Sequence, residues 1–209
     1  MQMPIIKKTD YLETKIDVIE RQKDVFIFKC GFSMNKNEAE ATGCSELTWV
    51  FPYLDCAGVW HPSCGFNRSI NADWSGYYKS MTASSAPVMA LFSEDGRNRY
   101  TVAVSEAKEI IEMKPGIHEE DGTVLLQIKV PEAYAAVTGK YELEVLIDRR
   151  DIPFYESIAD VSKWWETDCG LTPIEPVESA REPVYSTWYN YHQELKDGEI
   201  EKECQLASE

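Results

Sequence analysis

Long apolar runs are missing from this chain of 209 residues. A transmembrane helix needs a run of about 18 apolar residues or more, and no such run occurs. The segment from Met1 to Asp10 also lacks the apolar core that a secretory signal peptide requires. We therefore expect a cytoplasmic protein with no membrane partner.

Positive charge is also scarce. The chain has 21 Lys and Arg against 36 Asp and Glu, which gives a net charge of −15. An acidic surface of this kind repels the phosphates of nucleic acids and the headgroups of anionic lipids. Nucleic acid and membranes are therefore not expected as partners, and solubility is the simplest role for the excess charge.

Motifs for metal, nucleotide and serine-nucleophile chemistry are absent as well. The six cysteines form no Cys-x-x-Cys pair, so we expect reduced and mostly buried thiols. Cys56, His61 and Cys64 lie close together, but their spacing is not that of a zinc ligand set. There is no Gly-x-Ser-x-Gly and no phosphate-binding glycine loop. We expect neither a metal nor a cofactor.

Strand signals, by contrast, are abundant. Some stretches alternate apolar and polar residues with period two, and others are short continuous apolar runs, which are typical of half-buried and buried strands. The expected strands are Leu12–Val18, Val25–Phe28, Leu47–Leu54, Pro87–Phe92, Tyr100–Val104, Val124–Val130 and Tyr141–Ile147.

Turn residues separate these stretches. They occur at Glu94-Asp95-Gly96, Lys114-Pro115-Gly116, Asp121-Gly122 and Thr138-Gly139-Lys140. Many short strands with turns at this spacing favour an antiparallel β-sandwich. We predict a mainly β protein whose N-terminal sandwich domain covers residues 1–150.

The stretch from Cys56 to Ser85 interrupts the strand pattern. It is rich in Gly, Ser, Asn and aromatic residues, and we expect a long loop. Loops of this length in a domain are usually functional or disordered, and Trp60 and Trp74 argue against disorder. Asp73 beside Trp74 resembles a sugar-binding pair, although an aspartate there fits a turn equally well.

Residues 151–183 are expected to form a helix and a linker. The segment "ESIADVSKWWETDCG" has Ser157 as its expected N-cap and Gly170 as its C-terminal stop. Trp164 and Trp165 are expected to pack this helix against the sandwich. Three prolines in "LTPIEPVESAREP" favour an extended linker.

Residues 184–209 are expected to form a strand and a helix. Val184–Tyr191 suggests the strand, and Asp197 is the expected N-cap of a helix with Ile200, Cys204 and Ala207 on one face. No C-cap signal follows, so we expect the helix to continue beyond the last residue. A strand followed by a helix is half of a βα unit, whose apolar faces need further strands and helices.

The C-terminal segment "PVYSTWYNYHQELKDGEIEKECQLASE" resembles the first strand and helix of the catalytic (β/α)₈ barrel in the α-galactosidases of glycoside hydrolase family 36. The similar features are the proline-rich lead-in, the Trp and Tyr residues of Ser186–Tyr191, and the Leu206-Ala207 pair. "SAPVMALFSEDGRNRYTVAVSEA" is similar to a hairpin in that family's N-terminal sandwich. "WHPS", from Trp60 to Ser63, is similar to a loop that reaches toward the active site.

The resemblance implies a retaining glycosidase that removes terminal α-linked galactose from oligosaccharides. Retention uses a carboxylate nucleophile and an acid/base about 5–5.5 Å apart, and the resemblance places both on later barrel strands. This chain by itself is then expected to be inactive, with an incomplete barrel. The resemblance places Trp188 and Tyr189 at the sugar subsite, with Trp60 beside them, and implies oligomer contacts through the sandwich.

Two alternatives stay open. In one, the chain is a non-catalytic module that binds a carbohydrate through the Cys56–Ser85 loop. In the other, it is a structural module that dimerises through the apolar faces of Val184–Tyr191.

Overall fold

In the computed structural model, which describes residues 1–7, 12–34, 43–184 and 186–208, the chain divides into two units. Unit 1 is Met1–Leu171 and unit 2 is Thr172–Glu209. All of the described strands belong to unit 1, and unit 2 contains only short helices.

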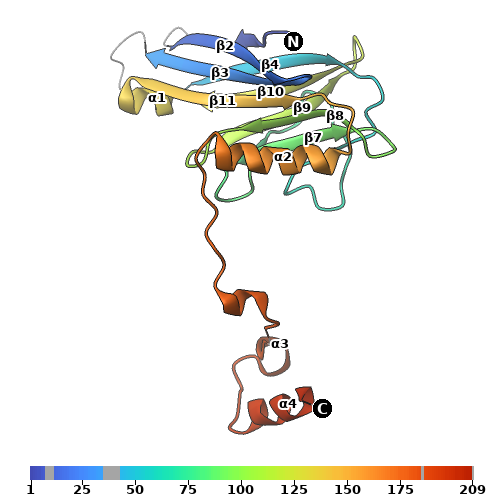
Figure 1. The fold of residues 1–209 in the computed structure, drawn as a ribbon, viewed down its shortest axis with the longest axis vertical. Coiled ribbons are helices and arrows are strands. Elements are labelled where there is room, and N and C mark those ends of the chain that lie inside the picture. The colour runs from blue at the N-terminus through green and yellow to red at the C-terminus, as the bar shows by residue number, and fades with distance from the viewer. Residues whose placement is uncertain (8–11, 35–42, 185, 209) are drawn as a thin grey trace. The chain divides into compact units, whose positions relative to one another are not determined.

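Unit 1 is built from two antiparallel sheets (Figure 1). The six-stranded sheet has the order β2 (Leu12–Gln22), β3 (Val25–Met34), β11 (Lys140–Asp148), β8 (Asn98–Val104), β7 (Val88–Phe92) and β5 (Gly58–Trp60). The five-stranded sheet has the order β1 (Ile5–Lys7), β4 (Cys44–Pro52), β10 (Thr123–Pro131), β9 (Ile111–His118) and β6 (Tyr78–Ser80). The predicted mainly β, sandwich-like fold is confirmed.

Alternating side chains from the two sheets form one core. Burial alternates along β4 and β10, as expected for strands with one solvated face. The ring of Phe28 on β3 meets Trp49 on β4 edge to face at 5.2 Å, and Phe51 stacks on Tyr100 at 4.2 Å. These aromatic contacts join the two sheets across the core.

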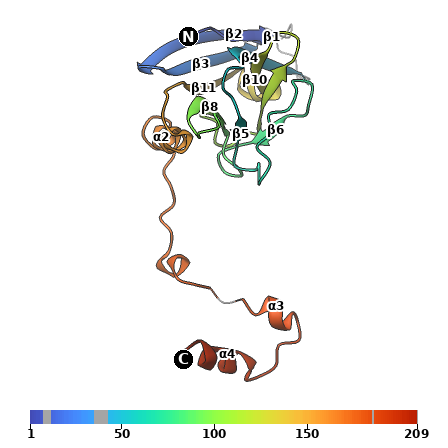
Figure 2. The same cartoon turned by 90° about the vertical axis from the view of Figure 1, so that its right-hand side faces the viewer.

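Helix α2 (Phe154–Thr167) covers the outer face of the six-stranded sheet, as Figures 1 and 2 show. Trp164 and Trp165 are buried against Ala103 and Leu146 of the sheet. The indole nitrogen of Trp165 donates to the carbonyl of Val104 at 2.9 Å. The prediction that these tryptophans pack the helix onto the sandwich is confirmed.

The predicted start of this helix is wrong. The helix begins at Phe154, directly after Pro153, and Ser157 lies buried in its first turns instead of capping it. The Ser157 hydroxyl donates to the buried carboxylate of Asp148 at 2.6 Å. A serine caps a helix only when its side chain is free to bond the helix backbone. Here the Ser157 side chain bonds Asp148 of β11 instead.

Lys114-Pro115-Gly116 is not a turn but the centre of β9. The amide of Ile117 donates to Asn71, away from the neighbouring strand β10. Pro115 lies two residues before Ile117, so its nitrogen also faces away from β10. The N–H that proline lacks would therefore make no bond to β10. The other predicted turn glycines, Gly96, Gly122 and Gly139, all have positive φ, and Gly139 ends an unpredicted helix, α1 (Ala133–Thr138).

The cysteines are less buried than predicted. All six are free, but only Cys30 and Cys56 are buried, and Cys44 and Cys204 are exposed. Burial raises the pKa of Cys30 to about 12 and that of Cys56 to about 11, so both stay protonated at neutral pH. The exposed Cys204 lies on a helix that buries none of its residues.

The predicted strand at Val184–Tyr191 is also wrong. Trp188–Tyr191 form a short helix, α3, and no described residue after β11 belongs to a strand. A barrel strand makes its backbone hydrogen bonds to neighbouring strands. With no strand beside it in the described chain, this segment makes local bonds instead, such as Tyr191 N–H to Thr187 O at 3.0 Å.

The remaining elements of unit 2 are η1 (Glu178–Arg181), a 3₁₀ turn in the proline-rich linker, and α4 (Glu199–Ala207). The predicted C-terminal helix is therefore present, although its N-cap is Gly198 rather than Asp197. Among the described residues, no helix has the length and apolar content needed to cross a membrane.

Candidate functional site

A polar pocket of about 250 Å³ lies in unit 1, between the Cys56–Ser85 segment and the five-stranded sheet. The segment contains β5 and β6 but is otherwise irregular. The pocket is lined by Val59, His61, Ser63, Cys64, Asn67, Ser69, Asn71, Ser75, Gly76, Tyr78, Met89, Met113, Lys114 and Pro115. Its volume lies just below the range of about 300–1,000 Å³ that is common for drug-sized ligands, so a small ligand fits best.

Lys114 holds one wall of this pocket. The side chain is almost fully buried, and its ammonium donates to the carbonyl of Asp73 and to that of Ser75 at 2.9 Å. It also lies 4.7 Å from the centre of the Tyr77 ring. Burial lowers the pKa of Lys114, and the negative charges of Asp73 and Glu46 oppose this shift. A buried cation with two carbonyl partners therefore fixes the loop to β9.

Close backbone contact supports the same wall. Asp73 N–H donates to Ile117 O at 3.0 Å, and Ile117 N–H donates to Asn71 O at 2.9 Å. A Cβ added to Gly116 would lie 2.5 Å from the Cα of Asp73. Glycine at this position therefore permits the loop to approach the strand.

His61 forms the opposite wall. Its ring lies 4.3 Å from that of Tyr78, and its Nδ1 is buried without a hydrogen-bond partner in the described part of the chain. Burial lowers the pKa of His61, and the positive charge of Arg68 lowers it further. The imidazole is therefore neutral at pH 7.

Hydrogen bonds from β6 fix this wall. The Tyr78 hydroxyl donates to the Ser85 carbonyl at 2.9 Å, and the Ser85 hydroxyl in turn contacts Ser63. A guanidinium nitrogen of Arg68 lies 2.8 Å from the sulfur of Cys64. The contact between Ser63 and Ser85 joins parts of the segment that are 22 positions apart.

The pocket lining contains hydroxyl, amide, imidazole and ammonium groups but no carboxylate among its described residues. Acid/base hydrolysis of a glycoside needs a pair of carboxyl groups, which this lining does not supply. Donors and acceptors without a catalytic pair are suited to binding a small polar molecule.

Exposed aromatic rings lie next to the lining residues in sequence. Trp74, beside Ser75, is 83% exposed, and Phe66, between Cys64 and Asn67, is fully exposed. An exposed indole offers an apolar face to the C–H face of a sugar. Trp74 therefore has the exposure that the predicted sugar contact requires.

Trp60 lies elsewhere on the same segment. It ends β5 and packs, partly buried, against the cluster beneath α2. It is not one of the residues that line the pocket, whereas its neighbour His61 is. Its partial burial leaves a smaller surface for a ligand than that of Trp74.

Trp188 and Tyr189 belong to unit 2. Both lie on α3 and are 53% and 85% exposed. Trp188 meets His192 edge to face at 5.5 Å and lines an open hollow of about 510 Å³ within this unit. The hollow includes Gln193 and Glu194 but not Tyr189.

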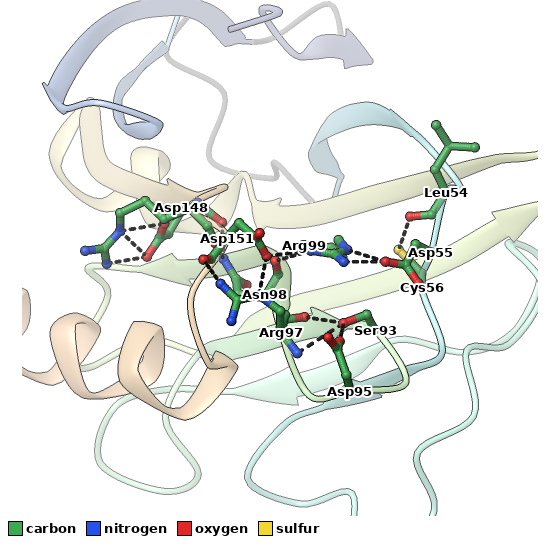
Figure 3. A network of polar contacts seen from close by, with 11 residues as sticks. Leu54, Asp55, Cys56, Ser93, Asp95, Arg97, Asn98, Arg99, Asp148 and Asp151 are labelled. Carbon is green, nitrogen blue, oxygen red and sulfur yellow. Dashed lines mark hydrogen bonds and ion pairs between the residues drawn. The ribbon is translucent and has the colours of Figure 1, made fainter.

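A second polar cluster in unit 1 is structural. Figure 3 shows Arg99 directed at Asp55 and Asp151. The carboxylate of Asp151 also accepts a hydrogen bond from Arg97 at 2.6 Å. The buried amide of Asn98 donates to the carbonyls of Asp148 and Arg150 at 3.0 and 3.1 Å (Figure 3). These bonds join β8 to the segment that enters α2, and each arginine has a carboxylate partner.

A metal site finds no support in the described residues, because no three His, Cys, Asp or Glu side chains are grouped as metal ligands. This holds for Cys56, His61 and Cys64, of which Cys56 is buried in the core.

Several pocket residues carried no signal in the sequence. Lys114 lay in a predicted turn, and its carbonyl partners are about 40 positions earlier in the chain. The composition of Cys56–Ser85 and the similarity of Trp60–Ser63 to a family loop were the signals for a functional loop.

Comparison with known proteins assigns no family. A scan against models of protein families finds no match, and a search of curated proteins finds none either.

Proposed function

We propose that this chain is the N-terminal part of a cytoplasmic, retaining α-galactosidase-like glycoside hydrolase, which removes terminal α-linked galactose from oligosaccharides. The chain would supply the β-sandwich and, through Trp188, Tyr189 and Trp60, part of the sugar subsite. The catalytic carboxylates would come from barrel strands that are not in this chain.

The observation that supports this proposal is the surface of unit 2. No described residue from 172 to 208 is buried, although the unit contains many large apolar side chains. The exposed ones are Ile174, Val177, Val184, Trp188, Tyr189, Leu195, Ile200 and Leu206. Barrel strands and helices would cover these apolar side chains.

The proposal predicts that this chain alone neither hydrolyses α-galactosides nor binds free sugar. The chain itself should not hydrolyse an α-galactoside such as p-nitrophenyl α-galactoside, because no carboxylate pair is provided for the sugar. It should also show no millimolar affinity for galactose or raffinose, because the subsite would be completed only by the barrel.

A second function, a non-catalytic carbohydrate-binding module, is favoured by the loop pocket. Its specific support is the exposed indole of Trp74, which lies beside the pocket residue Ser75 in the sequence. In this case the chain would bind a small sugar without any barrel.

Titration calorimetry of the full chain with galactose and raffinose separates the two functions. Millimolar or tighter binding that is lost in Trp74→Ala and kept in Trp188→Ala would favour the module. No binding by either variant or by the wild type is the result that the hydrolase proposal predicts. Both tryptophans are exposed, so neither substitution is expected to unfold unit 1.

A further inference from the structure

The longest strand of the protein has an open edge. β2 spans 11 residues and pairs on one side with β3 (Figure 1). On its other side, no strand of the described chain is paired with it. Such an edge presents unpaired N–H and C=O groups that can bind another strand. Natural edges are commonly short, contain proline, or carry charges and bulges. β2 is long and has no proline, but it carries charged residues such as Lys15 and an irregularity between Glu20 and Gln22.

We propose that the outer edge of β2 pairs antiparallel with β2 of a second copy of this chain, which joins the two six-stranded sheets. The inference goes beyond the proposed function and does not depend on it. A twofold axis normal to the sheet keeps each side chain on its own face, and opposite residues of a sheet share a face. Each allowed register is therefore centred on a residue that faces itself.

Charge favours the register centred on Ile16. There, Lys15 of each copy faces the partner subunit's Asp17, so two ion pairs form. A register centred on Thr14 also places Lys15 opposite a carboxylate, that of the partner subunit's Glu13, but it pairs only Leu12–Ile16 of the strand. Lys15 and Asp17 are 81% and 66% exposed and share the outer face, where their charged groups lie 3.5 Å apart within one strand. Opposite charges across a strand pair stabilise it, and like charges destabilise it.

The adjacent registers are less favourable. A register centred on Lys15 places two ammonium groups opposite each other, and one centred on Asp17 does the same with two carboxylates. A register centred on Val18 places Lys15 opposite the partner subunit's Arg21. The Ile16 register also pairs nine residues, Leu12–Glu20, all of which precede the irregularity between Glu20 and Gln22.

The inner face of β2 fits the same register. Val18 lies beside the buried Phe28 of β3 but is itself 42% exposed at the open edge. In the Ile16 register, Val18 faces the partner subunit's Thr14, and Ile16 faces the partner subunit's Ile16. Pairs of β-branched side chains are favourable in antiparallel sheets. The central pairs, Lys15 with Asp17 and Thr14 with Val18, favour a second copy over an unrelated peptide. The outer pairs, Leu12 with Glu20 and Glu13 with Ile19, add nothing to this preference.

Sedimentation equilibrium of the full chain tests the proposal through charge reversal. We expect the wild type to form a dimer, and Lys15→Asp and Asp17→Lys each to weaken it by about tenfold or more, because each places like charges opposite one another twice. The double variant exchanges the two charges and should restore the dimer. Lys79→Asp is the matched control, since Lys79 is an exposed, ion-paired lysine on the edge strand β6, and it should leave the dimer unchanged.

Hydrogen exchange of the wild type gives a second readout that needs no variant. Within Leu12–Glu20, the alternate amides that do not bond to β3 should become more protected as the protein concentration rises, while amides of β6 should not. A wild type that stays monomeric at every concentration overturns the proposal. So does a dimer that is insensitive to the single reversals, that the double variant fails to restore, or that protects other amides.

Discussion

Buried polar side chains fix the irregular parts of unit 1. Lys114 caps two loop carbonyls, Asn98 joins β8 to the entry of α2, and Asp148 receives a hydroxyl and a guanidinium. The partners of Lys114 and Asn98 are about 40 to 50 positions away, so no local pattern predicts them. The sequence indicates which residues are polar, but burial and long-range pairing decide which of them are structural.

Asp148 offers a test of this point. Its buried carboxylate accepts hydrogen bonds from Ser157 and Arg150, so Asp148→Ala leaves both donors without this partner. We expect a loss of about 3 kcal/mol in the free energy of unfolding, measured by urea denaturation. Asp160→Ala is the control, because Asp160 also pairs with Arg150 but is more exposed, and its loss should stay below about 1 kcal/mol. Equal effects would show that burial is not the cause.

His118 predicts a pH dependence. A side-chain bond to Asp121, 3.1 Å from Nδ1, raises the pKa of His118, and the charge of Asp73 adds to the shift. A raised folded-state pKa means that the stabilisation is complete below the unfolded value, near about 6.5, and is lost as pH rises through the folded value. The stability difference between wild type and His118→Gln should therefore be larger at about pH 5.5 than at about pH 8.5. A difference that grows toward alkaline pH would contradict this assignment.

At the scale of elements, periodicity predicted the strands well because the two faces of a sandwich strand have different environments. Each predicted strand in unit 1 overlaps an observed one, from β2 to β11. The errors arose where one residue has two structural meanings. Pro115 and Gly116 are typical of turns, but here they permit close contact inside β9. Ser157 is typical of a cap, but it bonds Asp148.

Gly116 tests how the loop is held against β9. In Gly116→Ala, the added Cβ would lie 2.5 Å from the Cα of Asp73, so the backbone of one segment must move. We expect a loss of about 1–3 kcal/mol in the free energy of unfolding, together with shifted amide resonances at 71–76. Gly31→Ala on β3 is the control, since its Cβ would meet only a backbone oxygen at 3.9 Å. If Gly116→Ala were as mild as the control, the close approach would not matter.

At the scale of the whole molecule, unit 1 has an apolar core, and no described residue of unit 2 is buried. The sandwich and α2 bury two apolar clusters, one between the sheets and one beneath the helix. This part of the fold was predictable because its strands find their partners within unit 1. The structure of the C-terminal segment was not predictable, because a strand forms only beside partner strands, and the described chain provides none there.

The candidate site was predictable only in part. The composition of Cys56–Ser85 predicted a functional loop, and the pocket is formed by it. The contributions of Met113 and Lys114 were not foreseen, because they come from a strand that folds beneath the loop. The roles of Trp188, Tyr189 and Trp60 in sugar binding stay predictions.

The proposed hydrolase is tested most directly by determining the coding sequence that follows Glu209 and assaying the protein it encodes together with this chain. We predict an in-frame strand with paired aspartates within about 30 codons, the length of one βαβ unit. We also predict hydrolysis of p-nitrophenyl α-galactoside with retention, reduced at least about tenfold by Trp188→Ala. A downstream sequence without such a strand, or an encoded protein that does not cleave α-galactosides, would contradict the proposal.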